Sequence, residues 1–216
     1  VNSVKLNGTK RKNFIKDLLE CDVLSEQSFF NPDESVKGEI HYKISDEFIY
    51  FYFYWMTKYK GIYNTTWSSL STTQDYSTWG GEVFERICFK NIHKISEFSQ
   101  IKAMYSAHWW KDFNNPKSKE IDILLNRDDK CLTIIEIKFY NDKVLFSSLV
   151  GDLQDKNDSL QNYLDNFRTT KLTKENKSKK INIIVMSLDG VTVTEASKAN
   201  EIYKKVYKTI KLEDIL

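Results

Sequence analysis

Apolar positions follow a strand-like pattern most clearly between Glu120 and Tyr140, where the chain reads EIDILLNRDDKCLTIIEIKFY. Residues 121–125 and 132–139 are rich in isoleucine and leucine, and they flank the polar run at residues 126–130. Two apolar runs joined by a turn-type cluster predict a β-hairpin.

The expected geometry of this hairpin brings two carboxylates together. If it folds about Asp129, Asp122 faces Glu136, because each lies seven residues from the turn centre. Side chains alternate along a strand, so Glu136 and Lys138 share a face and Ile137 points the other way. Directly opposed residues have Cβ atoms roughly 4.5–5.5 Å apart, and like charges there repel. A divalent cation would offset this repulsion.

Upstream of the hairpin the apolar positions change to a helical period. They fall at Val83, Phe84, Ile87, Cys88, Ile92 and Ile95. Gly80 and Gly81 predict a loop before this helix, which then carries Glu85 towards the hairpin. The alternative for Glu85 is an ion pair with a surface lysine or arginine.

Further segments predict a fold of the α/β (α+β) class. We expect helices at 10–21, 48–55 and 159–167, and strands at 40–44, 101–105 and 181–188. The expected domains are an N-terminal segment at 1–62, a polar linker rich in serine and threonine at 63–78, and a domain at 79–216 with the order α-β-β-β-α-β.

Composition narrows the class of protein. The 32 basic residues nearly balance the 30 acidic ones, and no apolar run is long enough to span a membrane. The aromatic run at 48–55 is expected to be a buried helix. The three cysteines lack CxxC spacing, which argues against zinc and against a disulfide framework. No secretory signal is present, so the sequence favours a cytoplasmic protein.

Asp122 followed by Glu136-Ile137-Lys138 resembles the signature of the PD-(D/E)XK nuclease superfamily. The segments WGGEVFE, HWW, EIDILL and EIKF, together with both ends of the chain, resemble the C-terminal nuclease-like module of archaeal-type and Bacteroides-type AAA ATPases. This resemblance implies a restriction-endonuclease-like core. It also implies that the chain is part of a longer ATPase-linked protein, although no GxxxxGK[ST] loop is present here.

The resemblance also assigns roles to particular residues. Glu85, Asp122 and Glu136 would hold Mg²⁺ or Mn²⁺, and Asp122, Glu136 and Lys138 would be catalytic. The expected reaction is hydrolysis of DNA, with RNA left open as a substrate. In this superfamily the helix after the hairpin often carries a lysine or glutamine near the site, and Gln161 and Tyr163 occupy the expected positions.

The N-terminal segment resembles the latter half of a winged helix, with residues 11–19 as the helix offered to a DNA groove and 31–38 as the wing. Its basic residues Lys10, Arg11, Lys12 and Lys16 either contact phosphates or form a solvated face. Trp109 and Trp110 either stack on a base or belong to the core.

Two other interpretations remain. The chain can be a catalytically inactive nuclease-fold module that binds nucleic acid or protein. Alternatively, Asp122, Glu136 and Lys138 can form an ion-paired patch, which fits less well because the sequence places only one cation beside two carboxylates.

Overall fold

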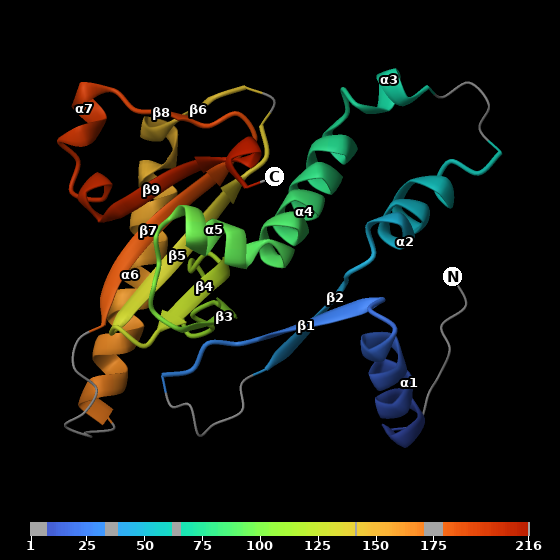
Figure 1. Ribbon diagram of the computed structural model, residues 1–216, viewed down its shortest axis with the longest axis horizontal. Coiled ribbons are helices and arrows are strands. Elements are labelled where there is room, and N and C mark those ends of the chain that lie inside the picture. Colours follow the sequence, from blue (N-terminus) through green and yellow to red (C-terminus); the bar gives the residue numbers. More distant parts are fainter. Residues whose placement is uncertain (1–7, 33–38, 62–65, 141, 171–178, 216) are drawn as a thin grey trace.

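The computed structural model describes residues 8–32, 39–61, 66–140, 142–170 and 179–215. At its centre is a five-stranded mixed sheet in the order β3-β4-β5-β7-β9 (Figure 1). The strands are β3 (Tyr105–Trp110), β4 (Ile121–Arg127), β5 (Cys131–Lys138), β7 (Lys180–Ser187) and β9 (Val206–Lys211). The first three are antiparallel neighbours, and the last two run parallel to β5. The predicted α+β class is confirmed.

Helices cover both faces of this sheet. The long helix α6 (Phe146–Thr170) lies behind it in Figure 1, and α4 (Gln74–Lys90) and α5 (Ile92–Phe98) lie in front. Two buried clusters result, one joining Leu124 and Ile134 to α6 and the other joining Ile123 and Ile135 to α4 and α5. Burial on both faces explains why β5 and β7 read as nearly continuous apolar runs.

The N-terminal segment is a helix followed by a hairpin. It comprises α1 (Gly8–Glu20), β1 (Leu24–Ser28) and β2 (Ile40–Ile44), with β1 antiparallel to β2. The expected helix and the expected strand at 40–44 are confirmed, whereas β1 was missed because its sequence, LSEQS, is mostly polar. Most of the expected wing, residues 33–38, lies outside the described residues.

The aromatic run forms α2 (Glu47–Phe51) and the π-helical turn η1 (Tyr52–Met56). Tyr50 and Trp55 are buried, but Phe48 and Phe53 are 69% and 61% exposed, so the prediction of a buried helix is half wrong. Only one face packs against α4, where the guanidinium of Arg86 lies 3.5 Å from the centroid of the Tyr50 ring.

Helix α4 begins earlier than predicted. Thr73 caps it by accepting a hydrogen bond from the Tyr76 N–H at 3.3 Å. Gly80 and Gly81 therefore lie inside the helix and not in a loop, and α3 (Trp67–Leu70) occupies part of the expected linker. The glycine at position 80 has a packing reason, since a Cβ there would lie 2.3 Å from a ring atom of Phe139.

The other boundaries shift by several residues. The strand expected at 101–105 is β3, and the helix expected at 159–167 begins at Phe146. The remaining elements are β6 (Val144–Leu145), β8 (Val191–Thr192), α7 (Glu195–Lys198), η2 (Tyr203–Lys205) and η3 (Leu212–Asp214). Across the described residues, the helices are too short or too polar for any of them to cross a membrane.

Candidate functional site

The central hairpin has the predicted register. Ile123 pairs with Ile135 and Asn126 with Leu132, so the turn is centred on Asp129. One further step in this register sets Asp122 opposite Glu136. Glu136 and Lys138 share the face that α6 covers, while Ile135 and Ile137 belong to the opposite core cluster.

Glu136 is held by two lysines from different elements. Its Oε1 lies 2.7 Å from Nζ of Lys138 on the same strand, and its Oε2 lies 2.7 Å from Nζ of Lys156 on α6. Glu136 is 2% exposed and Lys156 is 5% exposed. A buried carboxylate is costly unless it is paired and hydrogen-bonded, and both of its oxygens meet that requirement here.

Asp152 of α6 extends this charge cluster, which we define as Glu136, Lys138, Asp152 and Lys156. Its carboxylate lies 3.1 Å from Lys138 Nζ and 3.8 Å from Lys156 Nζ, and Lys119 reaches it at 2.8 Å. Burial acts to raise the pKa of Asp152, but the hydrogen bond from Lys119 and the charge of Lys156 outweigh it and lower the pKa. Burial likewise acts to lower the pKa of Lys138, yet Glu136 and Asp152 raise it.

Lys156 was missed at the sequence level although a signal was present. Along α6 the buried apolar residues are Phe146, Leu149, Leu153, Leu160 and Leu164. Lys156 lies three residues after Leu153 and four before Leu160, which puts a lysine on the stripe that faces the sheet. A charged residue at such a position is rarely buried unless it is paired.

The two residues expected near the site from α6 lie elsewhere in the fold. Gln161 donates hydrogen bonds to Asp165, one turn along the same helix, at 3.0 and 3.1 Å. The ring of Tyr163 packs 5.4 Å from the ring of Trp110. The side chain of α6 that reaches Glu136 is instead Lys156, five residues before Gln161.

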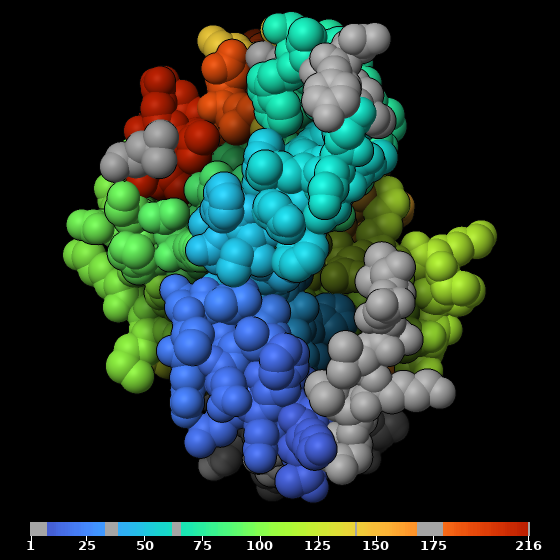
Figure 2. All heavy atoms as spheres, turned by 90° about the vertical axis from the view of Figure 1, so that its right-hand side faces the viewer, coloured from blue at the N-terminus to red at the C-terminus, as the bar shows by residue number. Residues whose placement is uncertain are grey.

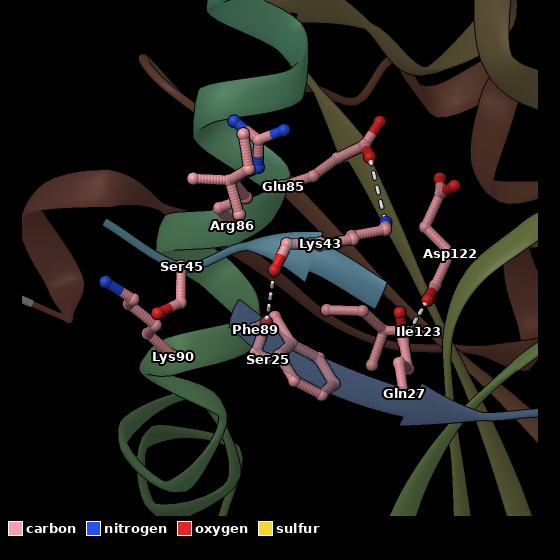
Figure 3. A pocket seen from close by; sticks show the side chains of 11 residues that line it. Ser25, Gln27, Lys43, Ser45, Glu85, Arg86, Phe89, Lys90, Asp122 and Ile123 are labelled. Carbon is pink, nitrogen blue, oxygen red and sulfur yellow. Dashed lines mark hydrogen bonds and ion pairs between the residues drawn. The ribbon is translucent and has the colours of Figure 1, made fainter. Parts of the chain in front are cut away.

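Asp122 also borders a small pocket on its other side. Glu85 from α4 and Lys43 from β2 line this pocket with Asp122, as Figure 3 shows, and the enclosed space of about 20 Å³ is enough for about one water molecule. Lys43 Nζ lies 3.8 Å from Glu85 Oε2. We call Glu85, Asp122 and Lys43 the carboxylate pocket.

Both carboxyl groups of this pocket resist ionisation. Burial, followed by the charge of Asp122, raises the pKa of Glu85 to about 7. Burial also raises the pKa of Asp122, although the positive charges of Lys156 and Lys43 oppose that change. The predicted repulsion was between Asp122 and Glu136, whereas the pKa of Glu85 is raised by its charged neighbour Asp122.

The N-terminal hairpin contributes a second contact to the pocket. The side-chain amide of Gln27 on β1 donates to the backbone carbonyl of Asp122 at 2.6 Å (Figure 3). Neither Gln27 nor Lys43 was predicted to lie at the site. Both are more than forty residues from any core strand, so no local pattern could link them to Asp122.

The arrangement of charges bears on metal binding. Within the part of the chain that the structure describes, no three His, Cys, Asp or Glu side chains are grouped so as to hold a metal ion. The carboxylates have more cationic neighbours than the sequence suggested, since Lys156 and Lys43 join Lys138. The argument against an ion-paired patch, which counted a single cation, is therefore wrong.

The remaining candidate residues lie away from these carboxylates. Trp109 and Trp110 are 2% and 0% exposed, so their rings are core residues and present no face on which a base could stack. The basic residues of the N-terminal helix are exposed on α1, and Lys16 pairs with Glu20 at 3.4 Å. Contact between these basic residues and phosphates stays a prediction.

Comparison with known proteins gives one family match. Residues 49–150 match DUF234, a family described as archaea bacterial proteins of unknown function. No curated protein and no solved structure matches the chain. The matched range contains Glu85, Asp122, Glu136 and Lys138, whereas Lys43 and Lys156 lie outside it. Over that range the chain is similar to a family whose function is unknown.

Proposed function

We propose that this chain is a nuclease domain of the PD-(D/E)XK type that hydrolyses phosphodiester bonds of DNA with the help of Mg²⁺ or Mn²⁺. One observation carries the proposal. An acidic residue on β4 stands in register with Glu136 of β5, Lys138 follows on the same face, and the next helix supplies Lys156 at 2.7 Å.

The donor atoms suit a hard cation. Carboxylate oxygens are what Mg²⁺ prefers, and it commonly takes only one or two protein carboxylates and keeps several waters. Since no group of three is assembled among the described residues, we assign two carboxylates to the ion at a time. Two pairs are available for the ion: Asp122 with Glu136 across the hairpin, and Asp122 with Glu85 across the pocket.

A bound divalent ion would polarise the phosphate and lower the pKa of a water ligand. The lysines then have a role of their own. Because the carboxylates raise the pKa of Lys138, its ammonium stays protonated at neutral pH and acts as a hydrogen-bond donor and not as a base. We assign it to holding the attacking water and balancing charge on the phosphate. Lys156 holds the carboxylate of Glu136 in place from α6.

Plasmid nicking tests this proposal. The wild type is incubated with supercoiled DNA and Mg²⁺ or Mn²⁺, beside Asp122→Asn, Glu136→Gln and the control Asp128→Asn, which alters an exposed carboxylate in the turn of the same hairpin. Nicking by the wild type and the control that both site variants lose supports the nuclease. Nicking that survives in both site variants excludes this site.

A second candidate is a nuclease-fold module without catalytic activity that binds nucleic acid or protein. It is favoured by the two lysines that occupy both oxygens of Glu136, since this cluster is electrostatically complete without a metal. Calorimetric titration separates the two. Metal binding without nicking points to this module with a retained site, and absence of metal binding removes the metal-dependent mechanism.

Partners are part of the same proposal. DNA is the proposed substrate, RNA is the alternative to be tested in the same assay, and α1 with its four basic residues is the proposed contact to the phosphate backbone. An ATPase domain is a proposed partner, and a cytoplasmic location is proposed from the sequence.

A further inference from the structure

The β1–β2 hairpin reaches from the N-terminal segment to the carboxylate pocket. Figure 2 shows this segment in blue, below the aromatic helix in cyan, on one face of the molecule. Its contacts to the pocket are the Lys43 ammonium, 3.8 Å from Glu85, and the Gln27 amide, 2.6 Å from the carbonyl of Asp122. The hairpin therefore touches both residues that carry the pocket's carboxylates.

The hairpin is held independently at its other side. The Phe30 N–H donates to the carbonyl of Trp109 at 2.8 Å, and the ring of His41 stacks on Trp109 with centroids 3.5 Å apart. Ser28 Oγ lies 2.8 Å from Nδ1 of His108. These contacts bind β1 and β2 to the edge strand β3, whereas Lys43 reaches the pocket through an ion pair of 3.8 Å.

Lys43 supplies the positive charge that the pocket needs. Glu85 and Asp122 are both partly buried, and a buried carboxylate is costly unless a positive charge accompanies it. In Figure 3 the ammonium of Lys43 projects from β2 towards the two carboxyl groups. A divalent cation held by the same oxygens would perform the same electrostatic task.

Two cations cannot use the same pair of carboxylates to full effect, because each weakens the attraction that holds the other. We propose that Lys43 is a built-in substitute for the metal, and that the β1–β2 hairpin is an autoinhibitory cover that metal binding displaces from Glu85 and Asp122. This inference rests on the proposed function. By reciprocity of coupled equilibria, a ligand that pulls the hairpin away also tightens metal binding.

Titration of the full chain with Mn²⁺ tests the competition. Lys43→Met keeps the length and apolar stem of the side chain but removes its charge. The matched control is Lys90→Met, because Lys90 lines the same pocket yet pairs with Glu47 at 2.8 Å. We expect Lys43→Met to bind Mn²⁺ about 1.5- to fivefold more tightly than wild type, the range of a partly exposed ion pair. Lys90→Met should bind like wild type.

The outcomes separate the two proposals. If the wild type binds Mn²⁺ and Lys43→Met binds it equally or more weakly, the cover is wrong while the metal site stands. If neither binds Mn²⁺, the metal site fails, and the cover fails with it.

A second measurement uses only the wild type and does not depend on how the variant folds. Amide hydrogen exchange is followed with and without Mg²⁺. We expect Mg²⁺ to speed exchange in β2 relative to β7 of the central sheet. Unchanged or slower exchange in β2 on saturation with Mg²⁺ overturns the cover.

Discussion

The carboxylate of Glu136 lies 2.7 Å from the ammonium of Lys156, and both side chains are almost completely buried. The pair joins the central strand β5 to α6 across the interior of the domain. Removing one partner of a buried ion pair leaves an uncompensated charge, which typically costs about 3–5 kcal/mol. Lys138 still holds the other oxygen of Glu136, so part of this cost is offset.

We therefore expect Lys156→Met to lower the free energy of unfolding by about 2–4 kcal/mol, as measured by urea denaturation. Adding Glu136→Gln should recover part of the loss, because the buried charge is then gone. The loss of stability in the double variant is compared with the sum of the losses in the two single variants. If the double variant loses that full sum, the two residues do not interact.

Glu85 makes stability depend on pH. An ordinary glutamate has a pKa near 4.5, and that of folded Glu85 is raised to about 7 by burial and by the charge of Asp122. Between these values the folded state binds more protons than the unfolded state, so the Glu85 contribution to stability is lost as pH rises from about 4.5 to 7.

Glu85→Gln should consequently stabilise the protein at pH 8 by on the order of 2 kcal/mol and have little effect at pH 4.5. Thermal unfolding at both pH values measures this difference. Glu97→Gln on the neighbouring helix α5 is a control with an exposed side chain. Equal effects of Glu85→Gln at the two pH values would contradict the raised pKa.

Two adjacent glycines of α4 are expected to respond in opposite ways to alanine. A Cβ at Gly81 meets nothing within 4 Å, so Gly81→Ala should stabilise the helix by about 0.5–1 kcal/mol. A Cβ at Gly80 would lie 2.3 Å from the Phe139 ring, so Gly80→Ala should destabilise by about 1–3 kcal/mol as the ring is displaced. Parallel urea denaturation of the two variants decides this, and two gains of similar size would refute the close contact.

Metal should stabilise the folded chain if the proposed site exists. Mg²⁺ at ten times its dissociation constant adds about 1.4 kcal/mol, which corresponds to a rise in Tm of about 3–6 °C for a chain of this size. Asp122→Asn should abolish this rise, whereas Asp128→Asn should retain it. A similar rise in Asp122→Asn would assign the bound metal to another place.

Sequence alone determined the features that depend on neighbouring residues. The β4–β5 register follows from a turn centred on Asp129 between two short apolar runs, and alternation then fixes that Glu136 and Lys138 share a face. These are local consequences of strand geometry, so they needed no knowledge of the rest of the fold. The α+β class follows in the same way from the order of strand and helix periods.

Boundaries with mixed signals were decided by packing. The prediction of a loop at Gly80 relied on the low helix propensity of glycine. In the structure Gly80 lies inside α4, because the ring of Phe139 packs where the Cβ of any other residue would be. The start of α6 was placed too late because Ser147, Ser148 and Gly151 interrupt the apolar positions of its first turns. The apolar stripe of the helix becomes evident only where it packs against the sheet. The same error hid Lys156.

Tertiary structure alone decided what surrounds the carboxylates. Lys43 and Gln27 reach Asp122 and Glu85 from a hairpin that is distant in sequence, and Lys156 reaches Glu136 from the helix on one face of the sheet. A sequence shows which residues can carry charge, but the distance between charges depends on how whole elements pack. That distance and its burial set the pKa values, the ion pairs and the room left for a metal.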